Sequence, residues 1–202
     1  MKLRNAEKRL LIAVSQIIEN EGFSKIGVNK IAKQAKCDKV LIYRYFGGLE
    51  GLLAAWAKDN DFYTLAYQAY SARVTKAESS EDIIKLTQTV LLKQLNFLRT
   101  NKLMQELLAW ELSGNSTFRS IQDERERNGF KLQEELEKKL GKESKDVRMF
   151  ITILIASINY IVLATRQYRI FNGIDFSNPE AWELCKQTIY KYIRALFENI
   201  LK

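Results

Sequence analysis

The chain contains very few residues that interrupt helices. Its 202 residues include one proline, Pro179, and nine glycines. Apolar side chains recur at intervals of three and four residues, the spacing of one face of an α-helix, as at Leu10, Leu11, Val14, Ile17 and Ile18. The sequence therefore predicts an all-α fold of about nine helices.

Turn and capping residues divide the chain into these helices. The first amphipathic helix should end at Gly22, because glycine commonly follows a helix C-terminus. Ser79 or Ser80 and, later, Asn178 before Pro179 are typical helix-starting residues. Beyond the first fifty residues, helices are expected over about 49–70, 80–99, 101–112, 116–140, 144–171 and 179–202.

Residues 22–48 predict two short helices joined by a turn. The first should cover 28–35 and the second 39–46, with Asp38 as the N-cap of the second and Gly47-Gly48 as the break after it. Two such helices joined by about three residues form a helix-turn-helix. We therefore expect a three-helix domain over residues 1–48 and a larger helical domain over residues 49–202.

Positive charge is concentrated in the same segment. Six lysines and arginines but only one acid, Asp38, lie between Gly22 and Gly48, whereas the whole chain has a net charge of +8. A compact basic patch is the electrostatic footprint of a polyanion-binding protein. A solvated charged face gives the same composition, so the helix-turn-helix beneath it decides for double-stranded DNA.

The residues of this segment resemble the DNA-binding signature of the TetR family of bacterial transcription regulators, over roughly residues 8–53. The resemblance implies a sequence-specific DNA-binding regulator, usually a ligand-responsive repressor, that binds a palindromic operator as a homodimer. The shared features are Gly22-Phe23, Ile31-Ala32, Ala35, Asp38-Lys39, the run from Ile42 to Phe46, and Leu52-Leu53.

The second helix of the motif should be the recognition helix. Ile42 and Phe46, four residues apart, are expected to face the core, so the remaining side chains point outwards. Lys39 can reach guanine or a phosphate, Leu41 a thymine methyl, and Arg44 a base or a phosphate. By resemblance, Tyr43 binds a backbone phosphate. The predicted DNA-binding residues are Gly27, Val28, Asn29, Lys39, Val40, Leu41, Tyr43, Arg44 and Tyr45.

The segment also departs from the family pattern. Leu49 stands where many relatives carry a phosphate-contacting lysine, Gly27 replaces a Ser/Thr cap, and Lys36 replaces a turn glycine. Val40 and Leu41 make the recognition surface unusually apolar. These departures leave open an alternative, a TetR-like interaction protein that has lost specific DNA binding.

The last expected helix carries a narrow apolar seam of the kind that packs two helices together. Together with the helix expected over 144–171, it resembles the family's contribution to a dimeric four-helix bundle. DNA geometry also favours a two-fold dimer, which reads a palindrome. Packing of the seam inside the monomer is the alternative. The predicted dimer interface is Trp182, Cys185, Ile189, Ile193, Leu196 and Ile200.

By resemblance, the helices between about residues 49 and 140 should surround a small-molecule pocket. An aromatic and methionine lining suits an apolar or amphipathic effector. Glu111 beside Trp110 would favour a cationic or hydrogen-bonding ligand, and it fits a surface position equally well. The candidate pocket residues are Phe62, Leu91, Leu95, Met104, Leu107, Trp110, Glu111, Phe118 and Tyr160.

Several function classes are disfavoured. The chain has no histidine, the commonest general base and metal ligand, and its two cysteines, Cys37 and Cys185, lack a partner set. We expect no enzyme activity, no metal and no cofactor. Two lone cysteines and no leader sequence predict a cytoplasmic protein. The apolar run over 149–164 is shorter than the roughly 20 residues of a membrane span, so no membrane partner is expected.

Overall fold

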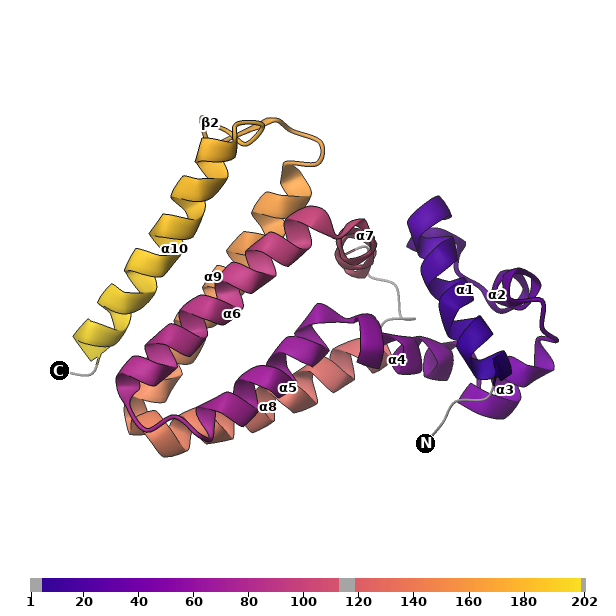
Figure 1. Cartoon of the computed structure of the whole chain (residues 1–202), viewed down its shortest axis with the longest axis horizontal. Coiled ribbons are helices and arrows are strands. Elements are labelled where there is room, and N and C mark those ends of the chain that lie inside the picture. The colour runs from indigo at the N-terminus through magenta and orange to yellow at the C-terminus, as the bar shows by residue number, and fades with distance from the viewer. Residues whose placement is uncertain (1–4, 113–118, 201–202) are drawn as a thin grey trace. The chain divides into compact units, whose positions relative to one another are not determined.

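The computed structural model of the protein describes residues 5–112 and 119–200. These residues form ten α-helices and one short antiparallel β-hairpin (Figure 1). The helices are α1 (Asn5–Glu21), α2 (Val28–Ala35), α3 (Val40–Phe46), α4 (Leu49–Asn60), α5 (Phe62–Val74), α6 (Ser80–Thr100), α7 (Lys102–Glu111), α8 (Arg119–Leu140), α9 (Ser144–Ala164) and α10 (Pro179–Ile200). The hairpin strands are β1 (Ile170–Phe171) and β2 (Ile174–Asp175), and two 3-10 turns, η1 (Phe23–Lys25) and η3 (Gly141–Glu143), complete the elements. The predicted all-α class is confirmed.

The chain divides into two compact units. The first comprises Met1–Leu65 and Lys102–Arg127, and the second comprises Ala66–Asn101 and Asn128–Lys202. Helices α5 and α8 each contribute residues to both units. The predicted boundary between a DNA-binding domain and an effector domain, after residue 48, stays a prediction.

In the first unit, α1 is the central core helix. It contacts α2, α3, α4 and α7, and its predicted apolar face is buried at Leu10, Val14, Ile17 and Ile18. Trp56 of α4 donates a hydrogen bond from Nε1 to Oγ of Ser15 at 2.9 Å. These contacts fix α4 on α1.

Helix α4 passes very close to the end of α3, and Gly51 permits this approach. A Cβ atom at Gly51 would lie 1.8 Å from the carbonyl oxygen of Phe46. Any other residue at this position would therefore clash with the backbone of the recognition helix.

A buried charge cluster joins three elements of the first unit. Arg125 of α8 donates to both carboxylate oxygens of Asp61, with Nη2 to Oδ1 at 2.6 Å and Nε to Oδ2 at 3.0 Å. Its Nη1 donates to Oε2 of Glu111 at the end of α7, at 2.7 Å. The guanidinium carbon lies 4.7 Å from the centre of the Tyr63 ring. Burial opposes the charge of Arg125, but the hydrogen bonds and charges of the two acids outweigh it and raise the pKa of the guanidinium.

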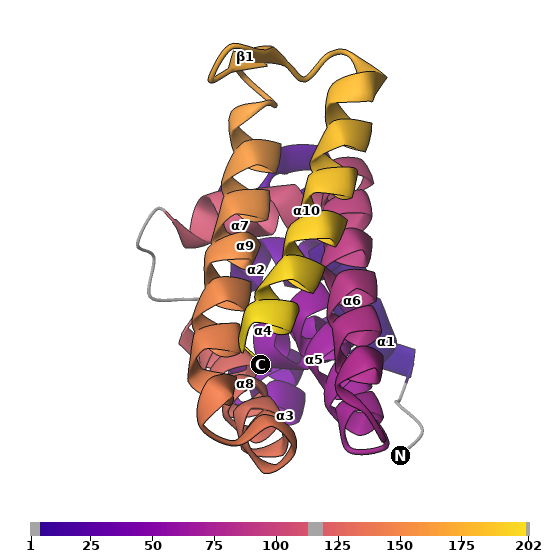
Figure 2. The same cartoon turned by 90° about the vertical axis from the view of Figure 1, so that its left-hand side faces the viewer.

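In the second unit, α6 packs against both α9 and α10 (Figures 1 and 2). Helix α6 begins with a capping box, in which Ser79 Oγ accepts from the Asp82 amide and the Asp82 carboxylate accepts from the Ser79 amide. This confirms the predicted N-cap region. Gln94 donates to Asn159 at 2.9 Å across α6 and α9, and Gln88 donates to the Tyr190 carbonyl of α10 at 2.8 Å.

Two expected helix boundaries were wrong. The helix expected over 49–70 breaks at Asp61, whose backbone is extended and whose carboxylate accepts the amide of Thr64 at 2.8 Å, so that a new helix starts there. The helix expected over 144–171 ends at Ala164, and a hairpin follows. Asn172 and Gly173 both have positive φ, 50° and 76°, as an Asn-Gly hairpin turn requires.

Candidate nucleic-acid interface

The turn between α2 and α3 is built from local hydrogen bonds. Lys36 ends α2 in a left-handed conformation, with φ of 51°, and the amide of Cys37 returns to the carbonyl of Ala32 at 3.0 Å. Asp38 Oδ1 accepts the amide of Val40 at 2.8 Å. The carboxylate therefore starts α3, one residue later than the sequence predicted.

Helix α3 has a buried and an exposed face. Ile42 is completely buried, and Phe46 is half-buried. Val40 is 60% exposed and Tyr43 is 56% exposed, while Lys39 and Arg44 are also exposed. The exposed face thus combines an apolar residue at the first helical position with basic and aromatic side chains around it. Leu41 and Tyr45 lie half-buried at its edges.

The start of α2 contributes the second part of the surface. No side chain caps this helix, because Gly27 occupies the N-cap with an extended backbone. Val28 is half-buried and Asn29 is exposed. The first-turn amides of a helix point outward and attract anions, so α2 offers main-chain donors where the family pattern usually has hydroxyls.

Most of the basic residues of this region are exposed. Lys30 forms an ion pair with Glu21 of α1, and the other five are exposed: Lys25, Lys33, Lys36, Lys39 and Arg44. Exposed lysines and arginines next to an uncapped helix start and a protruding short helix make a surface suited to a phosphate backbone.

Comparison with known proteins decides the class of this surface. Residues 11–56 match the family model described as "Bacterial regulatory proteins, tetR family". Residues 11–56 are therefore a TetR-type sequence segment. A search of curated protein sequences finds no match to this chain.

Solved structures show that the TetR-type fold extends beyond this domain. The repressor NalD from Pseudomonas aeruginosa is 14% identical with a TM-score of 0.65, covering 92% of this chain and 94% of its own. A TetR-family regulator from Streptomyces coelicolor has a TM-score of 0.63 at 13% identity, covering 98% and 91%. FadR from Bacillus halodurans has a TM-score of 0.59 at 18% identity, covering 100% and 97%. The chain therefore has the fold of a TetR-family transcription regulator.

The candidate effector residues are distributed over both units. Phe62, Met104, Leu107, Trp110 and Glu111 belong to the first unit, and Leu91, Leu95 and Tyr160 belong to the second. Met104, Leu107, Leu91 and Leu95 are buried, whereas Tyr160 is exposed on α9. Phe118 lies outside the described residues. The effector pocket as a whole stays a prediction.

Trp110 and Glu111 have identified partners in the first unit. The Trp110 ring lies 4.8 Å from the Phe23 ring, centre to centre, so it packs on the TetR-type domain. Glu111 is paired with Arg125 and also accepts a hydrogen bond from Gln122. Glu111 is therefore part of an ion-pair cluster in the first unit, and its role in an effector pocket stays a prediction.

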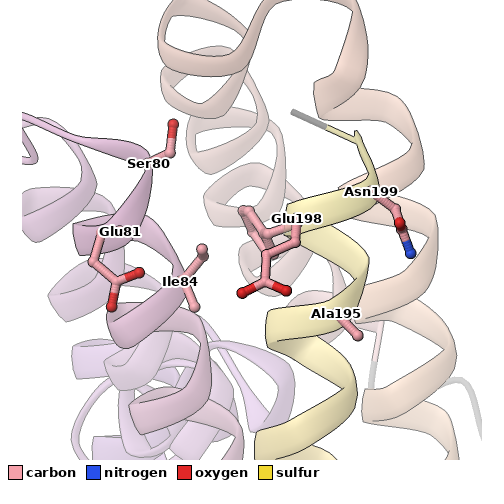
Figure 3. A pocket seen from close by; sticks show the side chains of 7 residues that line it. Ser80, Glu81, Ile84, Ala195, Glu198 and Asn199 are labelled. Carbon is pink, nitrogen blue, oxygen red and sulfur yellow. The ribbon is translucent and has the colours of Figure 1, made fainter. Parts of the chain in front are cut away.

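An open pocket of about 440 Å³ lies elsewhere, between the start of α6 and the end of α10 (Figure 3). Arg194 donates to both carboxylate oxygens of Glu81 beside it. None of the predicted effector residues lines this pocket. Its lining is Ser80, Glu81, Ile84, Ala195, Phe197, Glu198 and Asn199.

The predicted dimer seam lies mostly inside the protomer. Trp182, Ile189 and Ile193 are buried, because α10 packs this side on α6. Trp182 also donates to the Phe176 carbonyl at 2.8 Å and lies under the guanidinium of Arg99. Cys185, whose thiol pKa is raised by burial, and Leu196 are half-buried, and the side chain of Ile200 is outside the described part. The seam is therefore corrected to a core contact for its three buried members.

Proposed function

We propose that the protein is a homodimeric transcription regulator that binds palindromic double-stranded DNA through α2 and α3. One observation carries the proposal: a TetR-type helix-turn-helix presents Val40, Tyr43 and Arg44 on the exposed face of its second helix. Residues near the N-terminus of such a helix reach base edges in the major groove. Repression is the expected direction, as in NalD.

The contacts divide between phosphate and base. Tyr43, Lys39 and the first-turn amides of α2 are placed to bind phosphates, with Asn29 and Val28 beside them. Such contacts position the protein on the duplex, whereas groove contacts specify the sequence. Val40, Leu41 and Arg44 are the proposed base-reading side chains, with Tyr45 at the flank.

We assign the dimer contact to side chains other than the buried seam. On α9, Met149, Ile153 and Tyr160 are 62%, 54% and 59% exposed and share one helical face by their spacing. On α10, which contacts α9, Leu184 and Tyr192 are exposed. A two-fold dimer covers such a patch with its own copy, and a palindromic site requires two recognition helices.

Helix α9 also meets the length and composition of a membrane span, and 17% of its most apolar stretch is buried. Burial against a second copy accounts for this exposed apolar surface in a cytoplasmic protein. Sedimentation of the purified chain with and without lipid vesicles distinguishes a second protomer from a membrane as the partner of this surface. A stable dimer that does not float with lipid vesicles supports the proposal, and a monomer that floats with them contradicts it.

The helices of residues 49–202 are proposed to bind an apolar or amphipathic effector. An effector shifts DNA binding only as far as its affinities for the two dimer forms differ. We propose no catalytic role for the chain.

Selection of bound duplexes from a random pool tests the function. We expect the purified protein to recover a palindrome, with an affinity that falls steeply with salt because each phosphate contact adds about 0.9 to the log–log slope. Failure to bind any duplex above background at low salt would contradict the proposal.

A second candidate is a TetR-like interaction protein without specific DNA binding. It is favoured by Leu49, which places an apolar, half-buried residue at the first position of α4. Replacing Lys39, Tyr43 and Arg44 together distinguishes the two. An unchanged affinity for DNA would favour the interaction protein.

A further inference from the structure

Val40 is an unusual residue for the place that it occupies. It is the first residue of α3 and is 60% exposed. The backbone amide of Val40 donates a hydrogen bond to the Asp38 carboxylate at 2.8 Å. The next apolar residue of the helix, Leu41, is half-buried beside it, and Ile42 is fully buried. Val40 therefore packs little on its own domain, and its amide hydrogen bond holds its backbone at the start of α3.

The neighbours of Val40 on the same face are polar or charged. Tyr43 and Arg44 follow at three and four residues, the spacing of one helical face, and both are exposed. Lys39 precedes it and is exposed as well. The surface is an apolar tip surrounded by groups that bind phosphates and base edges.

The edges of base pairs in the major groove offer one apolar group, the C5-methyl of thymine. The other exposed groups there are hydrogen-bond donors and acceptors. A valine pressed against them would remove water from polar atoms without replacing its hydrogen bonds, which is unfavourable. The thymine methyl is the group of the major groove that gains most from contact with Val40.

We infer that Val40 is a specificity-determining residue that recognises the thymine C5-methyl in each half-site of the DNA. This inference rests on the proposed function, because it requires α3 to enter the major groove. Arg44 would then supply the polar part of the same base recognition, Lys39 would bind a phosphate beside it, and Leu41 would extend the apolar contact.

Replacing thymine by uracil in the duplex removes this methyl and keeps base pairing. The probe is the duplex that the wild-type protein selects from a random pool, with each thymine of one half-site replaced in turn. Loss of one buried methyl contact predicts about fourfold weaker binding at the critical position. The same thymine-to-uracil change should have a much smaller effect on the Val40→Ala variant, since the valine contact is already absent.

Ile12→Ala is the matched control, because Ile12 is an apolar residue of α1 that is 56% exposed. It should bind the probe as the wild type does and keep the full sensitivity to uracil. A thermal melt of Val40→Ala should match that of the wild type, because the side chain is mostly exposed.

The outcomes separate this inference from the proposed function. A duplex fully substituted with uracil that binds the wild type with unchanged affinity overturns the role of Val40 and leaves DNA binding intact. Equal sensitivity to uracil in the wild type and Val40→Ala overturns it too. Absence of binding to any duplex overturns both.

Discussion

Replacing Arg125 by methionine should destabilise the protein strongly. The side chain of Asp61 is 0% exposed, that of Arg125 is 11% exposed and that of Glu111 is 18% exposed. Methionine removes the cation and all three of its hydrogen bonds to the buried Asp61 carboxylate. Breaking a buried ion pair in this way costs about 3–5 kcal/mol, because the remaining charge is uncompensated.

Removing the uncompensated charge of Asp61 as well should restore most of the lost free energy of unfolding. Asp61 would still accept the amide and hydroxyl hydrogen bonds of Thr64, and an asparagine keeps an acceptor oxygen for them. The double variant Arg125→Met/Asp61→Asn should therefore be more stable than Arg125→Met alone. The difference between the effect of the double variant and the sum of the effects of Arg125→Met and Asp61→Asn alone measures the interaction energy of the pair.

Urea unfolding at one fixed protein concentration is the assay, because dimer stability depends on concentration. Arg127→Met is the matched control on the same helix. Arg127 is 65% exposed and pairs with Glu124 three residues away, so its loss should cost less than about 0.5 kcal/mol. The reasoning is refuted if Arg125→Met costs no more than Arg127→Met.

Three further predictions concern backbone and surface. Gly51→Ala should destabilise the first unit by about 3 kcal/mol, since its Cβ would meet the Phe46 carbonyl. The control Gly129→Ala should be neutral or stabilising, because a Cβ there has no atom within 4 Å. Equal melting temperatures of the two variants would contradict this expectation. Lys36→Gly should raise the free energy of unfolding by about 1 kcal/mol, because glycine adopts the left-handed conformation of this position without strain. If Lys36 touches a phosphate, the same change should also lower the salt slope of DNA binding by about 0.9. A loss of stability would contradict the first of these two expectations. Ile153→Lys should raise the dimer dissociation constant measured by sedimentation at least tenfold. The control Phe130→Lys, on α8, should leave it unchanged, although Phe130 is exposed to a similar degree. A larger effect of Phe130→Lys would place the interface away from α9.

The sequence predicted the fold best where local chemistry decides. Capping residues such as Ser79 and Asn178, and the helical periodicity of α1, predicted helix starts and core faces, because these depend on neighbours in the chain. The Asn172-Gly173 turn was readable in the same way and was overlooked. The break at Asp61 has a local signal too, because its carboxylate accepts the Thr64 amide as a helix N-cap does, and it was also overlooked.

The exposure of residues on α3 was easier to predict from the sequence than the packing partner of α10. The exposed face of α3 follows from helical spacing once Ile42 is placed in the core. The apolar residues of α10 did not reveal their partner, because periodicity gives a buried face without saying which helix covers it. Burial of Ile189 and Ile193 within the protomer answered this. Arg125 was missed because its partner Asp61 lies 64 residues away in the sequence. Gly51 was missed because its close approach to Phe46 depends on how α4 packs against the end of α3.

The most direct test of the central claim is a binding titration with the selected palindromic duplex. Wild-type protein is compared with the variant Lys39→Ala/Tyr43→Phe/Arg44→Ala. The three wild-type side chains are exposed, so the variant is expected to fold as the wild type does. Two wild-type protomers are expected to bind each duplex. The variant should bind more weakly, and its salt slope should fall by about 0.9 for each phosphate contact removed. A variant that binds the palindrome as the wild type does would contradict this claim.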